Sequence, residues 1–361
     1  MTHDMRWDQC INHRDAEALK FISSYFSDKA SPRRCLLICG AGFDPRATHV
    51  ADQLVAAAPQ YLRAVLIREE RPQADQELHK RADANEKKLT ATIPDNVVHV
   101  VNVFSEDEKT VVGGRRITQK LVAEALDELT DIVIDISALS IGISFPIVQQ
   151  FYNQACDKAN FPNVHVMVTT SPSIDGAVSS EVMDKLQMVH GFDPDFGTEA
   201  ESKKPKLWIP QLSSRAQSAL KLIFQRLDPE EVCPVLPFPA ADPRAVEELI
   251  EVFQEQIANT WNVDARDFLY AAEGHPLDLY RTILRVDAMR RLTYEVEDGS
   301  ITVLSPLGTK AMALGALLAA LDRKLPIAYV ESLKYQVQFS DNPPPPGLIH
   351  LWLTGEAYPN D

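Results

Sequence analysis

The chain has 361 residues, of which 45% are hydrophobic and 24% are charged, and its formal net charge at pH 7 is −15. At about 100–200 residues per domain, this length predicts two domains or one large α/β domain. No stretch approaches the ~20 unbroken apolar residues of a membrane span, and residues 1–15 lack the apolar core of a secretory signal. The negative charge argues against non-specific binding to DNA, which depends on Lys and Arg.

The number of cysteines indicates the redox environment of the protein. The five cysteines are too few and odd in number for a disulfide framework, and they are Cys10, Cys35, Cys39, Cys156 and Cys233. Free thiols are typical of a reducing environment, so we expect a cytoplasmic protein with no membrane contact.

In the first half, short apolar runs alternate with amphipathic stretches. The runs that predict buried strands are Cys35–Cys39, Arg63–Glu69, Val97–Val103, Asp131–Ile136 and Asn163–Thr169. Helices are expected between them, near residues 47–58, 73–88, 117–129 and 141–156, and one precedes them at Ala16–Phe26. Continuous apolar runs of this kind are typical of a parallel sheet covered on both faces.

The second half repeats this rhythm. Apolar runs begin at Lys206, Val232, Asp267, Ser300 and Pro326, each about 170 residues after its counterpart. The clearest helix between them starts at Asp242 and presents one apolar face. We interpret the spacing as a tandem duplication.

The predicted fold is therefore α/β, with two tandem Rossmann-like domains, each a parallel sheet of about five strands with helices on both faces. The expected boundaries are an N-terminal helical cap at 1–33, a first repeat at 34–170, a linker at 171–205, a second repeat at 206–335 and a Pro-rich tail at 336–361. In the tail, Pro343–Pro346 predicts a stiff spacer and Leu348–Leu353 an edge strand.

Ligands of open parallel sheets bind beyond the carboxyl ends of the strands, near the point where the strand order reverses. The loop after the fourth strand of the second half is the most informative there. Gly308 and Thr309 open a helix whose N–H groups favour an anion, and Lys310 adds a positive charge. Alternatively, Lys310 is a solvated first-turn residue and Gly308 serves packing. The spacing is not that of a P-loop.

The segment LSPLGTKAMALG, which contains Ser305, Gly308, Thr309 and Lys310, resembles the fourth-strand loop of CRISPR-associated Rossmann-fold domains. In the first half, Asp135 and Ser137 resemble the start of the Asp/Asn-x-Ser/Thr pattern of that family, although Ile141 stands where a basic residue is expected. In that family the loop contacts a cyclic oligonucleotide. The resemblance implies a tandem nucleotide sensor of bacterial antiviral defence.

Two Asp-Pro-Arg segments each follow a strand and open a helix. Asp44 and Asp242 are favoured N-cap residues, followed by Pro at the first helical position, so capping explains both segments. A functional alternative is that Arg46 and Arg244 bind a phosphate through their guanidinium groups.

A polar loop follows the third strand of the second half. Here Glu273 and His275 are candidates for a general acid and base, and Arg281 for holding an anion. Alternatively, the neighbouring Asp278 is simply a favourable charge in a first helical turn. Glu273, His275 and Asp278 are also candidates for a metal site, although they lack a recognised ligand spacing, and the sequence does not identify a cofactor.

Three hypotheses follow. In the first, two repeats enclose a nucleotide-like, phosphate-bearing ligand, contacted by Asp44, Arg46, Asp135, Ser137, Arg244, Arg281, Ser305, Gly308, Thr309 and Lys310. In the second, the protein is an enzyme acting on a phosphorylated or nucleoside substrate, with Glu273 and His275 as the catalytic pair. In the third, it is an adaptor subunit with a protein partner.

Overall fold

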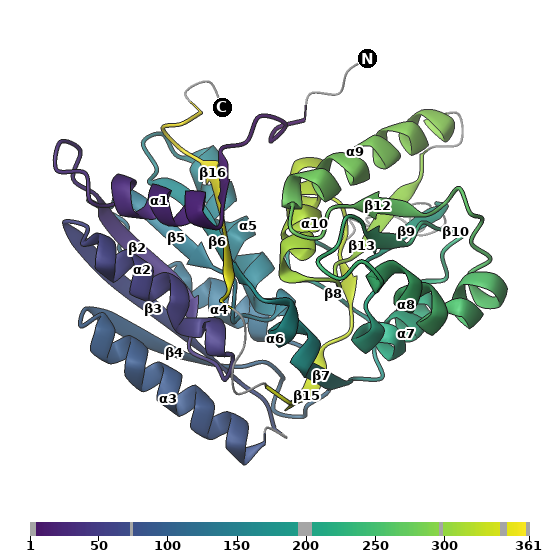
Figure 1. Ribbon diagram of the computed structural model, residues 1–361, viewed down its shortest axis with the longest axis horizontal. Coiled ribbons are helices and arrows are strands. Elements are labelled where there is room, and N and C mark those ends of the chain that lie inside the picture. The colour runs from purple at the N-terminus through teal and green to yellow at the C-terminus, as the bar shows by residue number, and fades with distance from the viewer. Residues whose placement is uncertain (1–4, 73–74, 194–203, 296–298, 340–344, 359–361) are drawn as a thin grey trace. The chain divides into compact units, whose positions relative to one another are not determined.

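The computed structural model describes residues 5–72, 75–193, 204–295, 299–339 and 345–358 (Figure 1). The chain forms two compact units. We call the unit made of Cys10–Val178 and Leu333–Asp361 the seven-strand unit, and the unit made of Met1–Gln9 and Ser179–Ser332 the split-sheet unit. Both contain parallel strands and helices, which confirms the predicted α/β class.

The seven-strand unit is built on one sheet with the order β1-β16-β6-β5-β2-β3-β4. Neighbours among β6, β5, β2, β3 and β4 pair in parallel, whereas β16 is antiparallel to β6 and β1 is antiparallel to β16. The strands are β1 Asn12–Arg14, β2 Arg34–Gly40, β3 Tyr61–Glu70, β4 Asn96–Asn102, β5 Asp131–Asp135, β6 Asn163–Thr170 and β16 Gly347–Thr354. The five strands expected in the first half are confirmed.

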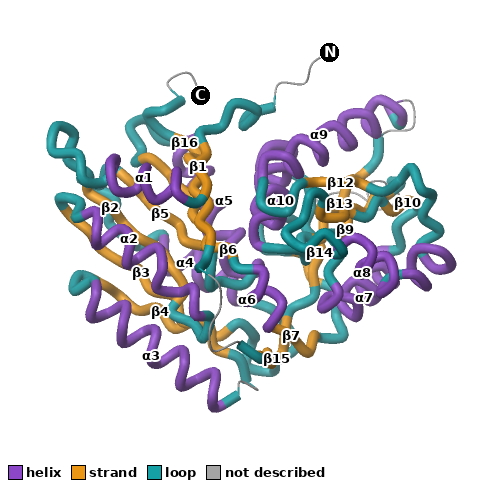
Figure 2. Tube along the Cα trace, viewed as in Figure 1, coloured by secondary structure: helices purple, strands orange, loops and turns teal. Residues whose placement is uncertain are grey.

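Helices cover both faces of this sheet, with α1, α2 and α3 in a row on one face and α4 and α5 on the other (Figure 2). Their bounds are α1 Ala16–Tyr25, α2 His49–Ala57, α3 Gln76–Thr92, α4 Gly113–Leu121 and α5 Ile141–Asp157. A 3-10 turn, η1 Pro45–Thr48, precedes α2, and a short helix, α6 Pro172–Ala177, follows β6.

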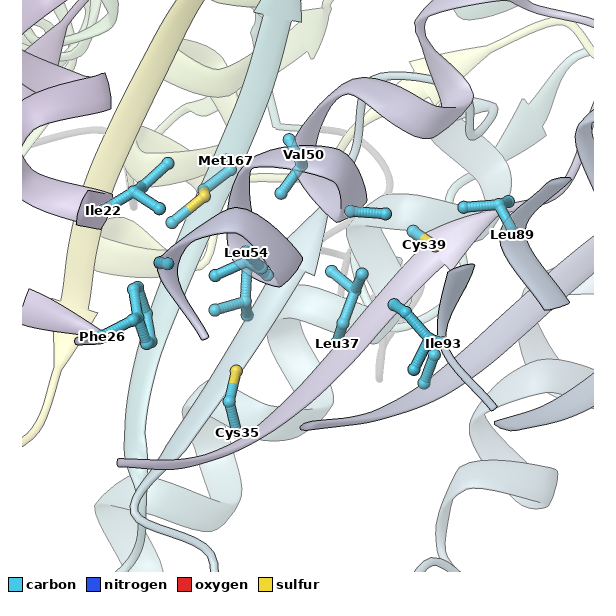
Figure 3. Close-up of a cluster of buried hydrophobic side chains, with 14 of the residues drawn as sticks. Ile22, Phe26, Cys35, Leu37, Cys39, Val50, Leu54, Leu89, Ile93 and Met167 are labelled. Carbon is cyan, nitrogen blue, oxygen red and sulfur yellow. The ribbon is translucent and has the colours of Figure 1, made fainter. Parts of the chain in front are cut away.

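The core of the unit lies between the sheet and the first row of helices (Figure 3). Cys35, Leu37 and Cys39 alternate along β2 onto one face and are completely buried against side chains such as Leu54 and Leu89. Burial raises the pKa of the Cys35 and Cys39 thiols well above the ordinary value. These cysteines are therefore apolar core residues rather than nucleophiles, as the sequence predicts.

The split-sheet unit contains shorter strands. β9 (Lys206–Pro210) pairs in parallel with β10 (Glu231–Val232) and β13 (Ile301–Ser305), and β11 (Val235–Pro237) pairs in parallel with β12 (Leu269–Ala271). β14 (Ala328–Tyr329) is antiparallel to β8 (Gln187–Met188). Single bridges join Gln211 to Val235 and Leu304 to Ile327.

These bridges extend the strand order of the split-sheet unit to β14, β13, β9, β11 and β12. The order is the same as that of β6, β5, β2, β3 and β4 in the other unit. The helices are α7 Gln217–Leu227, α8 Ala245–Val252, α9 Pro276–Thr293 and α10 Lys310–Arg323, with η3 Ser214–Ala216 before α7 and a π-helix at Gln256–Thr260. The shared order supports the interpretation as a tandem duplication.

The second sheet differs from the continuous five-stranded sheet that we expected. The run that begins at Val232 is divided, because β10 ends at Val232 and β11 begins at Val235, with Cys233 and Pro234 between them. Proline has no N–H to donate to a sheet ladder. The structure therefore has smaller sheets joined by single bridges in this unit.

The chain is also divided at places other than those expected. The N-terminal segment up to Gln9 belongs to the split-sheet unit, whereas the C-terminal tail belongs to the seven-strand unit. The expected edge strand near Leu348 is β16, which is not at the edge because β1 pairs with its outer side. The expected linker contains α6, β7 (Val178–Val182) and β8, and β15 (Ser332–Val337) follows β14 along the chain.

Part of the linker, residues 194–203, and part of the Pro-rich spacer, residues 343–344, lie outside the described residues. Among the described helices, none combines the length and apolarity that crossing a bilayer requires.

Gly40 provides a test of the close packing at the end of β2. A Cβ atom at Gly40 would lie 2.8 Å from the carbonyl oxygen of Ala138, which is backbone and cannot rotate away. At Gly42, the nearest atom would be 3.7 Å away, an ordinary contact. We expect Gly40→Ala to lower the free energy of unfolding by about 1–3 kcal/mol and Gly42→Ala to have little effect. Urea unfolding followed by circular dichroism distinguishes the two, and equal stabilities would contradict the packing argument.

Candidate functional site

Each unit has a point where its strand order reverses, and the loops that meet there define the candidate sites. In the seven-strand unit this point lies between β2 and β5, and in the split-sheet unit it lies between β9 and β13. The predicted site residues are distributed over these two edges, so each edge is described separately.

At the edge of the seven-strand unit, the loop after β2 is held by its neighbours. The side-chain amide of Asn85 on α3 donates to the carbonyl oxygens of Gly42 (2.7 Å) and Asp44 (2.9 Å). Asp44 accepts a hydrogen bond from the backbone N–H of Arg46 at 2.9 Å and caps η1, with Pro45 at its start. The capping interpretation of this Asp-Pro-Arg segment is therefore confirmed.

Arg46 is enclosed between two carboxylates. Its guanidinium binds Asp44 through Nε (2.9 Å) and Nη2 (2.7 Å) and binds Asp175 on α6 through Nη1 (2.7 Å). Although burial opposes the charge, the hydrogen bonds and proximity of Asp44 and Asp175 raise the pKa of Arg46. Only 4% of Arg46 is exposed, so a phosphate would have to displace a carboxylate before reaching it. The predicted phosphate contact of Arg46 remains a prediction.

Asp135 and Ser137, the predicted ribose or base contacts, lie inside the protein. Asp135 accepts hydrogen bonds from the backbone N–H (2.9 Å) and the hydroxyl of Ser137, and the Ser137 hydroxyl accepts from the backbone N–H of Thr169 (2.8 Å). Burial raises the pKa of Asp135 to about 7, and the nearby Asp44 carboxylate adds to this effect. The two side chains therefore join β5 to β6 beneath the loop.

Sequence reasoning did not single out a third interaction at this edge. Glu69, at the end of β3, accepts a hydrogen bond from the backbone N–H of Ser140 at 2.8 Å and pairs with Arg71 at 3.0 Å. Arg71 also lies over the ring of Tyr335, 4.9 Å from its centroid. The bond from Ser140 cannot be identified from local sequence, because the two residues are 71 positions apart along the chain.

At the edge of the split-sheet unit, the N-terminus of α10 begins as predicted. Thr309 is the N-cap, and its hydroxyl accepts from the backbone N–H of Met312 at 3.4 Å. Gln211, which directly follows β9, accepts from the backbone N–H of Gly308 at 3.2 Å and donates to the carbonyl of Met312 at 3.1 Å. Gln211 is a positioning residue that sequence reasoning missed, although its place immediately after the first strand is a signal for it.

Gly308 approaches Gln211 closely, since a Cβ atom there would lie 2.8 Å from Oε1 of Gln211. Ser305 is completely buried, accepts from the indole N–H of Trp208 at 2.9 Å and donates to the carbonyl of Ala328 at 2.8 Å. Ser305 therefore ties β13 to its neighbouring strands, and its predicted role as a ligand contact remains a prediction.

Glu273 joins three loops of this edge. Its carboxylate accepts from the backbone N–H of Ala241, in the loop after β11, at 2.7 Å. Its backbone carbonyl accepts from the hydroxyl of Thr309, in the loop after β13, at 3.4 Å. Glu273 itself follows β12, so the loops after β11, β12 and β13 meet here. His275 is the N-cap residue of α9, and Asp278 accepts from the backbone N–H of Ala272 at 2.8 Å.

The two other predicted cations have different surroundings. Arg244 is exposed at the start of α8, where its backbone N–H donates to Asp242 at 2.9 Å. Arg281 pairs with Asp8 at 2.8 Å and also donates to the Asp8 carbonyl, so it anchors the N-terminal segment. The second Asp-Pro-Arg segment thus forms the turn that opens α8, and its arginine points to solvent.

The structure therefore brings Glu273, Gly308 and Thr309 together at one edge and Asp44, Arg46, Asp135 and Ser137 at the other. Over the described ranges, no group of three or more His, Cys, Asp or Glu side chains has an arrangement that holds a metal ion.

Two solved structures are distantly similar to this chain. No protein-family model matches the chain, and no curated protein matches it. A Type III CRISPR defence DNA nuclease activated by cyclic oligoadenylate aligns with a TM-score of 0.49 and 10% identity, over 80% of this chain and 64% of the nuclease. A structure named for a universal stress protein from Pseudomonas aeruginosa UCBPP-PA14 aligns with a TM-score of 0.22 and 9% identity, over 86% of this chain and 95% of that one.

The chain thus covers less than two thirds of the nuclease. At this degree of similarity, neither structure says what this chain does, and the function has to be argued from the sites.

The raised pKa of Asp135 predicts how the stability of the folded protein depends on pH. Between about pH 4 and pH 7, Asp135 stays protonated in the folded state, whereas an ordinary Asp ionises in the unfolded chain. The folded state then binds more protons, so stability falls as pH rises through this window, by up to about 1.4 kcal/mol per pH unit. Asp135→Asn keeps the accepting oxygen and removes this slope.

Urea unfolding at pH 4.5 and pH 7.5 measures the effect, with the exposed Asp157→Asn as control. We expect Asp157→Asn to follow the native protein and Asp135→Asn to lose less stability between the two pH values. An Asp135→Asn variant with an unchanged slope would contradict the assignment.

Proposed function

We propose that the split-sheet unit binds a nucleotide-like, phosphate-bearing ligand at the N-terminus of α10 and acts as a ligand sensor. The observation that carries this proposal is the meeting of three loops at Glu273 beside the Thr309 cap. This arrangement brings the turn that opens α8 and the first turn of α10 to one edge of the same unit.

The electrostatics of this edge favour an anion. The first N–H groups of a helix carry a partial positive charge that suits phosphate. Lys310, half-buried in the first turn of α10, adds a full charge where a cation opposes the helix dipole. Because the chain has a net charge of −15 and a cation at a helix N-terminus destabilises the helix, Lys310 is better explained by anion binding than by helix stability.

The edge of the seven-strand unit supports anion binding less well. Arg46 is already neutralised by Asp44 and Asp175, and the carboxyl group of Asp135 is buried beneath it. A phosphate bound to Arg46 would have to displace Asp44 or Asp175 and would be repelled by both, whereas the Glu273 carboxylate at the α10 edge accepts a hydrogen bond from the backbone N–H of Ala241 and is not bound to a cation that the phosphate needs. We therefore place the ligand at α10 and assign the first edge a mainly structural role.

The class of ligand that we propose rests on the sequence motif after β13. The segment around Gly308 and Lys310 resembles the loop that contacts a cyclic oligonucleotide in CRISPR-associated Rossmann-fold domains. Cyclic oligoadenylate is therefore the first ligand to test, and the corresponding biological role is sensing in bacterial antiviral defence. Mononucleotides and inorganic pyrophosphate are the comparison ligands, because they share the phosphate without the ring.

The test is calorimetric titration of the full chain with cyclic tetra-adenylate, AMP and pyrophosphate. A hydrogen bond to a charged group contributes about 1.5–3 kcal/mol, so we expect Lys310→Ala to weaken binding at least about 10-fold. Lys221→Ala, an exposed lysine on α7, is the matched control and should bind like the native protein.

Equal affinities in Lys310→Ala and the native protein would remove Lys310 from the site. Binding that is abolished by Arg46→Gln and unaffected by Lys310→Ala would place the ligand in the seven-strand unit instead. No binding of any of the three ligands would contradict the proposed function.

A further inference from the structure

A continuous line of four ionisable side chains crosses the seven-strand unit, at a distance along the strands from the edges described above. Nδ1 of His13 lies 2.9 Å from Nδ1 of His350, and Nε2 of His350 lies 2.9 Å from Nδ1 of His165. Nε2 of His165 lies 3.1 Å from Oδ1 of Asp131. The four residues come from β1, β16, β6 and β5, so the line passes through four adjacent strands.

The inner part of this line has no contact with solvent. Asp131, His165 and His350 are completely buried, and only His13 is partly exposed. Phe21 stacks on both His13 (4.6 Å between ring centroids) and His350 (4.1 Å). A buried polar line in aromatic surroundings is costly unless each member is hydrogen-bonded, and here each imidazole bonds to the next group.

Asp131 determines the direction of the hydrogen bonds. Oδ1 of Asp131 accepts from the Tyr25 hydroxyl (2.8 Å) and the Asn163 amide (3.1 Å), and Oδ2 accepts from the Thr130 hydroxyl (2.6 Å). Although burial opposes ionisation, the bond from His165 and these donors lower the pKa of Asp131. Asp131 is thus an ionised acceptor, and His165 must present an N–H to it.

The hydrogens of the line then follow in order, because a neutral imidazole has one N–H and one accepting nitrogen. His165 carries its proton on Nε2, so its Nδ1 accepts from Nε2–H of His350. Nδ1 of His350 must then accept from Nδ1–H of His13. The accepting nitrogen that remains is Nε2 of His13, at the partly exposed end.

We propose that His13, His350, His165 and Asp131 form a proton relay that takes up one proton at His13 and holds it on His165 beside Asp131. The proton adds to Nε2 of His13, whose Nδ1 proton moves to Nδ1 of His350. The Nε2 proton of His350 moves in turn to Nδ1 of His165. One proton enters, and the positive charge ends next to the Asp131 carboxylate.

The groups around the line favour transfer of the proton from His13 to His165. Burial lowers the pKa of His13 and holds that of His350 well below its ordinary value, so neither ring retains the proton. The other titratable groups that face the line are Glu17 and Tyr25 on α1, Arg33 before β2, Cys35 on β2 and Glu356 after β16. Arg33 is paired mainly with Glu356, at 2.9 Å, and lies 4.0 Å from Asp131.

The relay joins strands from both ends of the seven-strand unit's sequence. β1 follows the N-terminal segment and β16 belongs to the C-terminal tail, and the bond between His13 and His350 joins them. Uptake of a proton reverses the direction of this bond without breaking it. The relay does not depend on the ligand proposed at α10, because α10 belongs to the other unit.

Imidazole ¹⁵N chemical shifts of the full chain, recorded as a function of pH, test the relay. At high pH we expect His13 as the Nδ1–H tautomer and His165 and His350 as the Nε2–H tautomer. On acidification, His165 should become doubly protonated while His13 and His350 exchange tautomers, all with one shared midpoint.

Asp131→Asn keeps the accepting oxygen and removes the charge, so the shared midpoint should move to lower pH by about 1–3 units. His350→Phe keeps a ring on Phe21 and interrupts the line, so His13 and His165 should titrate separately. The exposed His190→Gln is the matched control and should leave the shared midpoint unchanged.

Protonation of His13 with no change in the tautomers of His165 and His350 in the native protein would overturn the proposal. An unmoved midpoint in folded Asp131→Asn would overturn it as well. If Asp131→Asn fails to fold, the native titration and His350→Phe still decide.

Discussion

The cost of removing charge from water governs both ends of the sheet in the seven-strand unit. At the carboxyl ends of the strands, Arg46 is buried and is matched by two carboxylates, while Asp135 avoids the cost by remaining protonated up to about pH 7. Towards the amino ends, Asp131 stays ionised because donors surround it. In each place the burial is tolerated only because every charge has its partner.

This constraint distinguishes two edges that have the same strand order. Both units reverse their order between the first and fourth strands, and both bring a glycine close to a neighbouring loop at that point, Gly40 against Ala138 and Gly308 against Gln211. In the seven-strand unit, cations at the edge are used to neutralise the protein's own carboxylates. In the split-sheet unit, the uncharged side chain of Gln211 holds the N-terminus of α10 at Gly308, and Lys310 lies in the first turn of that helix.

The sequence predicted the elements better than the contacts between them. β-Branched runs and capping residues located the five strands of the first half and the starts of η1 and α10, because those signals are local. The division of the second sheet at Pro234 has a local signal, which the sequence analysis did not use. The place of β16 inside the first sheet and the pairing of Arg46 with Asp175 depend on residues far apart along the chain. The line from His13 to Asp131 was missed for the same reason, since its members come from four separate strands.

The proposed function requires that an anion binds at α10 and not at Arg46. Hydrogen–deuterium exchange of the full chain, with and without cyclic tetra-adenylate, examines both edges in one experiment. We predict slower exchange in residues 305–313 on addition of the ligand, with exchange in residues 40–48 and 135–141 unchanged. Slower exchange confined to residues 40–48 and 135–141 would contradict this prediction.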